Sequence, residues 1–193
     1  MVGILALQGD FAAHRQALAE RGVTIREVRK PADLEGLCGL VLPGGESTTM
    51  LKLMAEFGLE SPLKHAIAGG LPVLATCAGV ILLAREVQNP PQPSLGVLDV
   101  VVVRNAYGRQ LASTVATLEV TAPEELRVPT LEGVFIRAPK LVQMGEGVKV
   151  LAKRGPDPVL VRQQTILAAT FHPELSPKNP VIDLFLQLAR RGE

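Results

Sequence analysis

The first part of the sequence alternates short apolar runs with segments of helical character. The opening run, Val2–Leu7, is apolar throughout, as expected for a strand buried on both faces of a sheet. Strands that alternate with helices along a chain predict a parallel sheet with helices on both faces. The runs that we interpret as strands are Val2–Leu7, Thr24–Val28, Gly39–Leu42 and Pro72–Thr76.

Helix start signals lie between these runs. Asp10, Ser47 or Thr48, and Ser61 each precede a segment of helical character, and short polar side chains cap the free N–H groups of a helix. Proline directly after Ser61 strengthens the third signal, because proline fits the first turn of a helix. We expect helices over residues 11–21, 48–57 and 62–68.

The second half of the chain is rich in β-like segments with few helices between them, which predicts largely antiparallel strands. Gln163 and Gln164 separate two of these segments, as in a hairpin, and Asn89–Pro93 is expected to be a rigid surface loop. A C-terminal helix over Pro180–Arg190 carries apolar residues at helical spacing. The β-like segments cover residues 97–104, 114–121, 134–136, 148–153, 159–162 and 165–171.

Together these patterns predict an α/β fold. We expect a three-layer open sheet, mostly parallel with an antiparallel extension, with helices on both faces. Residues 1–193 contain no repeat, no low-complexity tract and no linker, so we expect one domain.

The composition argues against several classes of function. Twenty basic and 19 acidic side chains are nearly balanced, which disfavours nucleic acid or an anionic membrane as the main partner. No apolar run approaches the ~20 residues of a membrane helix, and residues 1–10 lack the features of a signal peptide. Two cysteines make no disulfide framework, which favours the reducing cytoplasm, and no Cys/His cluster has the spacing of a metal site.

Cys77 is the strongest candidate for a catalytic residue. It ends the apolar run Pro72–Thr76 and is flanked by small residues, and an apolar helix-like segment, Val80–Arg85, follows at once. A strand that turns sharply into a helix, with a nucleophile at the bend, is a nucleophile elbow. The free N–H groups and the positive dipole end of that helix favour the thiolate form of the cysteine.

A second loop, Gly44-Gly45-Glu46-Ser47, also follows a predicted strand. Two glycines before a helix let backbone N–H groups face an anion without obstruction. The loop lacks the Lys-Ser/Thr ending of a Walker motif, so a phosphate loop is one interpretation and an oxyanion hole is the other. In the second interpretation, an N–H group of the Gly44–Gly45 region and that of Ala78 stabilise a tetrahedral intermediate.

The third loop, near the end of the sequence, holds His172 and Glu174. In an extended stretch two residues that are two positions apart point to one side, so the carboxylate can orient the imidazole and favour its protonated form. Ligands of open α/β sheets bind outside the carboxyl ends of the strands, where we expect the three loops to converge. Cysteine, histidine and glutamate together suggest acyl transfer by covalent catalysis.

The remaining chemically interesting residues have simpler interpretations. We expect Cys38 to be a small buried hydrophobic residue. His14 and His65 lie within predicted helices without an evident partner, so we expect them to be solvated. Arg104 and Arg137 each end an apolar stretch, and each is either a surface charge at a strand end or a bidentate ligand for a carboxylate.

These motifs resemble those of class I, triad-type glutamine amidotransferases. Within that class, the sequence is most similar to the family of glutaminase subunits of two-subunit pyridoxal 5'-phosphate synthases, over nearly the whole chain. The cysteine elbow marks the superfamily, whereas the runs Pro-Gly-Gly-Glu-Ser-Thr-Thr and Gly-Val-Phe-Ile-Arg-Ala-Pro are more specific to this branch. The matching stretches are Leu5–Gly9, Leu42–Met50, Thr76–Gly79, Val103–Asn105, Tyr107–Gln110, Gly133–Pro139 and Phe171–Glu174.

The resemblance implies a flavodoxin-like fold and a role for each candidate. Cys77 would be the nucleophile, His172 the general acid/base and Glu174 its orienting partner. One departure is visible, because Ala75 stands where the elbow usually has glycine. The loop and pocket that bind glutamine would comprise Gly44, Gly45, Glu46, Arg104, Ile136 and Arg137.

The resemblance also implies a partner. The chain would hydrolyse L-glutamine and pass the ammonia through a protein interior to a (β/α)8-barrel synthase, in an assembly of 12+12 subunits that makes pyridoxal 5'-phosphate. No cofactor is expected on this chain itself. We expect weak activity of the isolated chain, because the flexible Gly44–Gly45 peptide would form the oxyanion site only when the partner docks.

Three alternatives remain at this point. The chain could be the glutaminase of another synthase, such as one that makes an imidazole ring. It could be a redox or stress sensor on the same kind of sheet, with Cys77 as the oxidisable group. It could also be a cysteine peptidase or another hydrolase that uses the same elbow.

Overall fold

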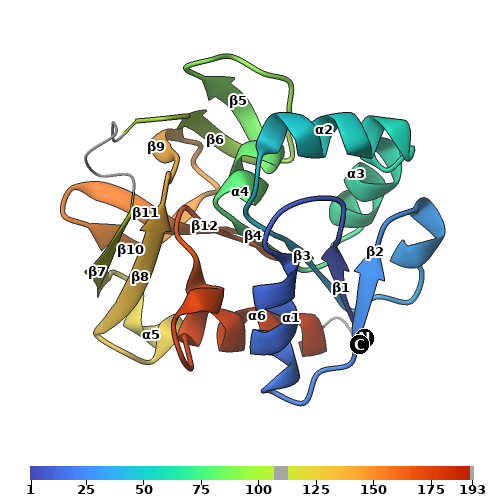
Figure 1. Ribbon diagram of the computed structural model, residues 1–193. Helices are drawn as coiled ribbons and strands as arrows, with labels where there is room; N and C mark the ends of the chain where they lie inside the picture. The colour runs from blue at the N-terminus through green and yellow to red at the C-terminus, as the bar shows by residue number, and fades with distance from the viewer. Residues whose placement is uncertain (107–112, 192–193) are drawn as a thin grey trace.

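The computed structural model describes residues 1–106 and 113–191 (Figure 1). The strands are β1 (Val2–Leu5), β2 (Ile25–Val28), β3 (Gly39–Leu42), β4 (Val73–Thr76), β5 (Ala84–Gln88), β6 (Leu98–Val103), β7 (Ser113–Val120), β8 (Thr130–Ile136), β9 (Lys140–Met144), β10 (Lys149–Arg154), β11 (Asp157–Gln163) and β12 (Ile166–Ala169). The α-helices are α1 (Phe11–Ala19), α2 (Ser47–Glu56), α3 (Glu60–Ala68), α4 (Ala78–Leu83), α5 (Pro123–Leu126) and α6 (Pro180–Arg191), and η1 (Pro31–Leu34) and η3 (Pro173–Leu175) are 3-10 helices.

Nine strands form one sheet in the order β2-β1-β3-β4-β12-β11-β10-β7-β8. The strands from β2 to β12 run parallel, and the strands from β11 to β8 pair antiparallel. The change occurs at β12, which lies parallel to β4 and is joined to β11 by a tight turn between Gln163 and Ile166. The expected α/β class with an antiparallel extension is confirmed, as is the hairpin.

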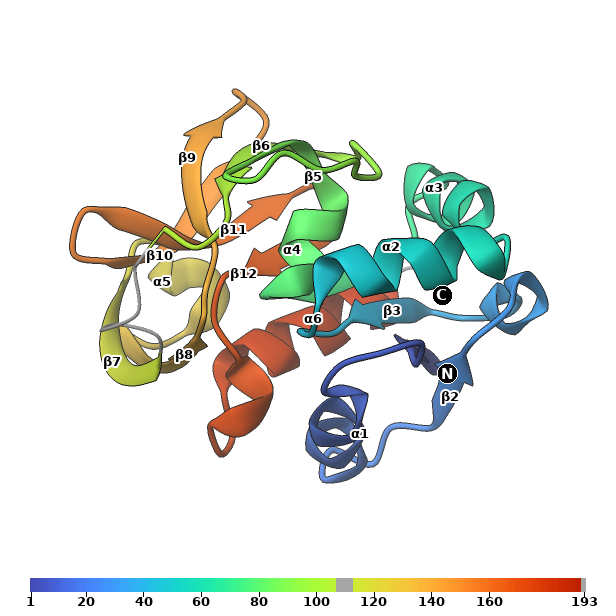
Figure 2. The same cartoon turned by 45° about the horizontal axis from the view of Figure 1, so that its top comes forward.

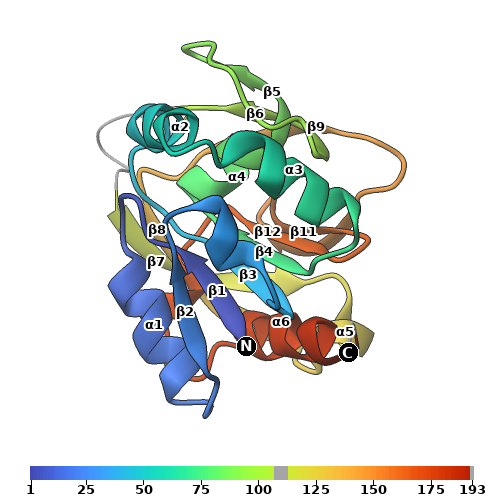
Figure 3. The same cartoon turned by 90° about the vertical axis from the view of Figure 1, so that its right-hand side faces the viewer.

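The central strands are buried on both faces because helices cover the sheet on each side. Figure 3 shows α2, α3 and α4 on one face and α1 and α6 on the other. β1, β3, β4 and β12 are buried at every position, as their apolar sequences predict. Two apolar cores result, one between the sheet and α1 with α6, and one between the sheet and α2–α4.

A second sheet, in the order β5-β6-β9, packs on the same side as α2–α4 (Figures 1 and 2). The sequence analysis did not anticipate this separate sheet or strands β5 and β9, and it was wrong to place Arg85 in a helix. Helix α4 ends at Leu83, and β5 begins at Ala84, which pairs in parallel with Leu98. Only Ala84 and Val87 of β5 are buried, and so short an apolar pattern does not distinguish a strand from the end of a helix.

Two helices begin differently from the prediction. The cap of α2 is Glu46, not Ser47 or Thr48, because the Glu46 carboxylate accepts hydrogen bonds from the N–H groups of Thr48 and Thr49. A charged acceptor at the positive end of a helix is stronger than a hydroxyl. Helix α3 already begins at Glu60, so Ser61 does not cap it.

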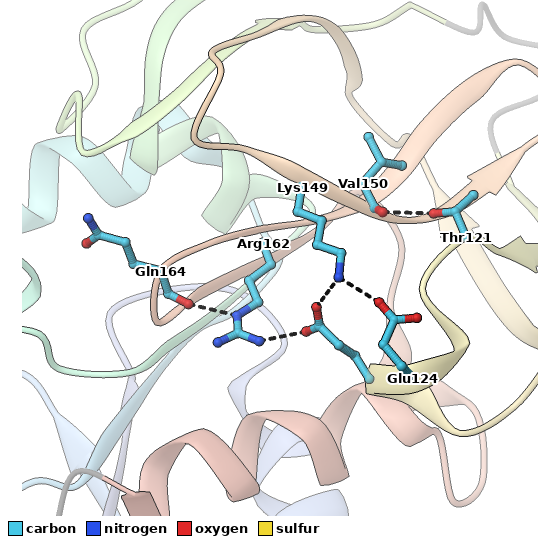
Figure 4. Close-up of polar contacts among 7 residues, drawn as sticks. Thr121, Glu124, Lys149, Val150, Arg162 and Gln164 are labelled. Carbon is cyan, nitrogen blue, oxygen red and sulfur yellow. Dashed lines mark hydrogen bonds and ion pairs between the residues drawn. The ribbon is translucent and has the colours of Figure 1, made fainter.

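Charged side chains tie the short helix α5 to the antiparallel strands (Figure 4). Lys149 on β10 donates hydrogen bonds to Glu124 and Glu125, each at 2.7 Å. Arg162 on β11 donates to Glu125 at 2.6 Å and to the carbonyl of Gln164 at 2.8 Å. Glu125 is the less exposed of the two glutamates and joins both basic residues.

Candidate active site

Cys77 lies on a sharp turn between strand β4 and helix α4. Its φ angle is +47°, in the left-handed region that residues other than glycine rarely adopt. Its N–H group donates to the carbonyl of Ala169 on the neighbouring strand, at 2.9 Å. Helix α4 begins at the next residue, Ala78, so free N–H groups of its first turn lie beside the cysteine. The turn has the geometry of a nucleophile elbow.

Close packing around the elbow explains its small residues. A Cβ atom on Gly79 would lie 2.2 Å from the carbonyl oxygen of Leu42, so any other residue would push α4 away from β3. Ala75, where the elbow motif usually has glycine, is fully buried in β4 next to Leu42 and Ala168. Its methyl group belongs to the core between the sheet and α2–α4, not to the wall of the active-site cavity.

The three loops of the sequence analysis follow β3, β4 and β12, which are neighbours in the sheet. Because these strands are parallel, their carboxyl ends meet at one edge, where a cavity of about 390 Å³ opens. Every candidate site residue except Glu174 lines this cavity. These residues are Gly44, Gly45, Glu46, Cys77, Ala78, Arg104, Ile136, Arg137 and His172.

Glu174 lies behind His172, away from the cavity. The Nδ1 atom of His172 and the Oε1 atom of Glu174 are 2.7 Å apart, and the glutamate side chain is fully buried. The sequence analysis expected an extended backbone here, and that expectation was wrong, because Pro173–Leu175 forms the 3-10 helix η3. The proline at its first position favours this turn, which brings the carboxylate back onto the imidazole.

The surroundings of His172 favour its charged form. Burial, the largest influence, lowers the pKa of His172, but hydrogen bonds with Cys77 and Glu174, aided by the charges of both groups, raise the pKa to about 10. Burial also raises the pKa of Glu174, but His14 and His172 outweigh it and hold that pKa at about 2. The imidazole is therefore protonated and the carboxylate ionised at neutral pH.

His14 is not solvated, contrary to the sequence analysis. It projects from α1 into the core and is 1% exposed. Its Nε2 atom lies 3.2 Å from Oε1 of Glu174 and 3.0 Å from Oγ1 of Thr76. The helical spacing around His14 gave no signal for this contact, because its partners come from β4 and from the end of the chain.

The Gly44–Gly45 loop packs directly against the catalytic candidates. A Cβ atom on Gly44 would lie 2.5 Å from Cε1 of His172 and 3.4 Å from Cβ of Cys77, so only glycine permits this approach. The carbonyl of Gly44 accepts a hydrogen bond from the N–H of Asp10 at 3.1 Å. The side-chain oxygen of Gln8 accepts one from the N–H of Glu46 at 2.8 Å. The loop after β1 therefore fixes this glycine loop, which the sequence analysis did not foresee.

Arg104 points into the site and is held there by the Asn89–Pro93 loop. The Oε1 atom of Gln92 accepts hydrogen bonds from the Arg104 guanidinium at 2.5 Å and from the Ser47 hydroxyl at 2.9 Å. A guanidinium nitrogen of Arg104 also lies 3.7 Å from a carboxylate oxygen of Glu46. Sequence analysis missed Gln92, since a proline-rich loop does not indicate where its single amide points.

The rim of the cavity combines apolar and charged groups. Ile136 is exposed, and its carbonyl oxygen lies 3.7 Å from the Cys77 sulfur. Arg137 follows it with a φ angle of +47° and an exposed side chain. A hydrogen bond from the Thr49 side chain, opposed by burial and aided by the N–H groups of Thr49 and Thr48, lowers the pKa of Glu46 to about 2. The rim thus carries a permanent negative charge at Glu46 beside positive ones.

Comparison with known proteins assigns the chain to a family. The model of the SNO glutamine amidotransferase family matches residues 4–190. The chain belongs to the SNO glutamine amidotransferase family. A protein of Koribacter versatilis, the pyridoxal 5'-phosphate synthase subunit PdxT, is 50% identical, and the match covers 99% of this chain and 96% of that protein. The protein of the same name from a strain of Thermus thermophilus is 51% identical, with 98% and 97% covered.

Solved structures agree with this assignment. The crystal structure of a glutamine amidotransferase is 50% identical to the chain, superposes with a TM-score of 0.90 and covers 98% of both chains. A putative GMP synthase subunit from Thermoplasma acidophilum is 17% identical, with a TM-score of 0.72 and 98% and 94% of the chains covered, and shows the fold alone. One stretch that carried the family resemblance, Tyr107–Gln110, lies outside the described residues.

The other candidates lie away from the site. Cys38 is half-buried, not fully buried as expected, and its sulfur contacts the amino group and the carbonyl of Met1. His65 is exposed on α3, as expected, but its Nδ1 atom lies 2.8 Å from the carbonyl oxygen of Ser61. Within residues 1–106 and 113–191, no group of three or more His, Cys, Asp or Glu residues is suited to a metal ion. In the same ranges, every helix is too short or too polar to cross a membrane.

Proposed function

We propose that this chain is the glutaminase subunit of a pyridoxal 5'-phosphate synthase, and that it hydrolyses L-glutamine to L-glutamate and ammonia through a thioester on Cys77. The observation that carries the proposal is the alignment of three groups at the elbow. Cys77 and His172 line one cavity and both pack against Gly44, and Glu174 holds the other side of the imidazole from a fully buried position. Cysteine, histidine and an orienting carboxylate in this order are the parts of acyl transfer.

The first half of the reaction forms the thioester. The Cys77 thiolate attacks the side-chain amide carbon of glutamine and makes a C–S bond, while the carbonyl electrons move to oxygen. N–H groups of the Gly44–Gly45 region and of Ala78 stabilise this oxyanion, each by roughly 3–4 kcal/mol. As the intermediate collapses, the C–N bond breaks and the His172 imidazolium gives its proton to the departing nitrogen, which leaves as ammonia.

The second half restores the enzyme. The neutral imidazole of His172 takes a proton from water, and the resulting hydroxide attacks the thioester carbon. The C–S bond then breaks, which releases glutamate and returns the thiolate beside an imidazolium. Glu174 stays ionised throughout and stabilises the charged ring each time it forms.

The rim of the cavity matches the charged end of glutamine. Arg104 and Glu46 place a guanidinium and an ionised carboxylate 3.7 Å apart, next to Ile136 and Arg137. Free glutamine carries a carboxylate and an ammonium on one carbon atom, so we assign Arg104 to the carboxylate and Glu46 to the ammonium. This pair would distinguish free glutamine from glutamine within a peptide chain.

The partner in this proposal is the synthase that the relatives' name implies. It would be a (β/α)8 barrel that receives the ammonia, in a complex of 12+12 subunits in the cytoplasm. Residues 1–193 would act as one glutamine amidotransferase domain. Family membership and 50% identity to a PdxT protein over nearly the whole chain support this assignment.

Substitution of the nucleophile tests the proposal directly. Cys77→Ala should abolish glutamine hydrolysis in the presence of the synthase, because no other described residue is placed to form the thioester. The thermal unfolding temperature should stay close to the wild-type value. Cys38→Ala is the matched control and should keep full activity, since Cys38 lies outside the cavity. Appreciable turnover by the Cys77→Ala variant would refute the assignment.

A further inference from the structure

We propose that His14 is a positioning residue of the active site: its Nε2–H group pairs with the Glu174 carboxylate and, through its hydrogen bond with Thr76, ties that carboxylate to the elbow strand. This inference rests on the proposed function, because it adds a member to the same catalytic arrangement. His14 does not line the cavity, so it would act through its contacts with Glu174 and Thr76.

The contact geometry fixes where the proton of His14 sits. One ring nitrogen, Nε2, lies 3.2 Å from Oε1 of Glu174 and 3.0 Å from the hydroxyl oxygen of Thr76. An ionised carboxylate only accepts hydrogen bonds, so an Nε2 atom without hydrogen would face it lone pair to lone pair in a buried place. His14 therefore carries hydrogen on Nε2, which is hydrogen-bonded to the Thr76 hydroxyl and lies at ion-pair distance from Oε1 of Glu174.

Glu174 depends on this second contact. Its side chain is fully buried, His172 and His14 both bind Oε1, and Oε2 has no hydrogen-bond partner among the described residues. A buried carboxylate that keeps few hydrogen bonds tends to take up a proton. The charge and hydrogen bond of His14 come directly after burial among the influences on the Glu174 pKa, and they lower it.

Among the described residues, the other charged groups around Glu174 are not paired with its carboxylate. Arg21, which follows α1, is paired with Asp183 of α6, and Glu132 of β8 accepts a hydrogen bond from Ser176. Glu174 also borders a cavity of about 300 Å³ between α1 and the segment after β12, and Glu20, Arg21 and Lys178 line the same cavity. Within residues 1–106 and 113–191, the groups paired with the carboxylate are the two histidines.

Thr76 gives the contact a second consequence. It is the last residue of β4 and directly precedes Cys77, whereas Glu174 follows β12. The His14 ring therefore connects Thr76, at the base of the elbow, with the Glu174 carboxylate. This connection would fix the distance between Cys77 and Glu174, on either side of His172. A ring from α1 thereby supports a site whose catalytic groups all come from other elements.

A matched pair of variants separates the hydrogen bond from the space it occupies. Glutamine resembles histidine in the reach of its N–H donor, and methionine has nearly the shape of glutamine without the donor. With the synthase present, His14→Met should lower kcat about a hundredfold with little change in KM, since a misplaced catalytic group costs about that much. The acid limb of this variant's pH–rate profile should move to higher pH by about one unit or more, because Glu174 then becomes protonated more easily. His14→Gln should recover most of both effects.

The outcomes are unambiguous. His65→Gln, which changes the exposed histidine of α3, is the control and should leave rate and pH profile unchanged. Equal pH profiles for wild type and His14→Met would overturn the proposal, as would failure of His14→Gln to improve on His14→Met.

A second readout needs neither glutamine nor the synthase. In a Cys38→Ala background, the alkylation rate of Cys77 by iodoacetamide is followed against pH, and its acid midpoint should move upward in His14→Met. This result stands even if the chain hydrolyses no glutamine, so it separates failure of the inference from failure of the proposed function.

Nitrogen-15 NMR of the wild-type imidazoles covers the case in which the variants do not fold. An Nε2 atom of His14 without hydrogen near neutral pH would overturn the proposal.

Discussion

In the proposed mechanism, the charge state of His172 decides how the site works. Its pKa is raised from 6.5 to about 10, so protonation favours the folded state fully below about pH 6.5, and that contribution is lost as the pH rises through about 10. The proposed mechanism gives the same proton to the departing nitrogen. We therefore expect the basic limb of glutaminase activity to lie far above neutral pH.

Glu174→Ala tests this account of His172. The glutamate raises the pKa of His172 by its hydrogen bond and its charge, so its removal should shift the basic limb to lower pH. We expect kcat to fall by about a hundredfold or more, as when general acid–base catalysis is disabled, with KM nearly unchanged because Glu174 does not line the cavity. Steady-state kinetics across pH, with the synthase present, measure both. An unchanged turnover number would contradict the role.

Sequence analysis could identify those candidate residues that lie close together in the sequence or stand at a special turn. Cys77 stands at a strand-to-helix bend, and His172 and Glu174 are nearly adjacent, so local reasoning was enough to select them as candidates. His14 and Gln92 were missed because their partners are distant in the chain. A buried histidine on a helix and an amide in a proline-rich loop leave no periodic trace.

Among the elements, β4 shows how a departure from the family pattern is absorbed. Ala75 is fully buried between β3 and β12, where its methyl group packs in the core. Ala75→Gly should therefore destabilise the protein by about 1–2 kcal/mol, from the lost methyl contact and the greater freedom of glycine in the unfolded chain. Glutaminase kinetics should stay at the wild-type level. Urea unfolding measures the first effect, and a stability gain would show that the methyl group strains the strand.

Helix α5 offers a second test at this scale. Glu125 is mostly buried and joins Lys149 to Arg162, so Glu125→Ala should reduce stability by about 1 kcal/mol. Glu124→Ala removes only the exposed half of the same cluster and should cost less. In 1 M salt the difference between the two variants should shrink, because screening weakens ion pairs at the surface. Unfolding curves at two salt concentrations decide it, and equal losses for both variants would contradict the central place of Glu125.

Element boundaries were predictable where one signal dominated. The buried strands of the parallel sheet and the amphipathic C-terminal helix follow from their apolar patterns. The separate sheet of β5, β6 and β9 could not be predicted, because β9 is short and largely exposed and pairs only with β6 among the described strands. The cap of α2 was misassigned to Ser47 or Thr48. The side chain of Glu46 accepts the hydrogen bonds from the first-turn N–H groups instead.

For the whole molecule, the parallel order β1-β3-β4-β12 matters most. It brings the loop after β1, the glycine loop, the elbow and the histidine loop to one edge of the sheet. This convergence followed from the rule that ligands bind at the carboxyl ends of parallel strands. The position of β12 beside β4 could not be read from the sequence, because it depends on how a late strand returns to the centre of the sheet.

The loops at this edge are the means by which a partner would control the enzyme. The N–H group of Asp10 binds the carbonyl of Gly44, the side-chain oxygen of Gln8 binds the N–H group of Glu46, and this loop carries one part of the proposed oxyanion site. We expect the isolated chain to be a weak glutaminase and the synthase to raise its kcat severalfold or more. Coupled assays of glutamate release, with and without the synthase, measure the difference. Equal rates in both would contradict activation by docking.

Gly79 has a consequence for anyone who surveys variants of this protein. The backbone of α4 lies so close to β3 at this position that even one methyl group would collide with a carbonyl oxygen. A saturation screen for activity should therefore show position 79 as intolerant as position 77, although glycine offers no reactive group. From such a screen alone, Gly79 would be mistaken for a catalytic residue. What selection preserves at this position is the close approach of two backbone segments.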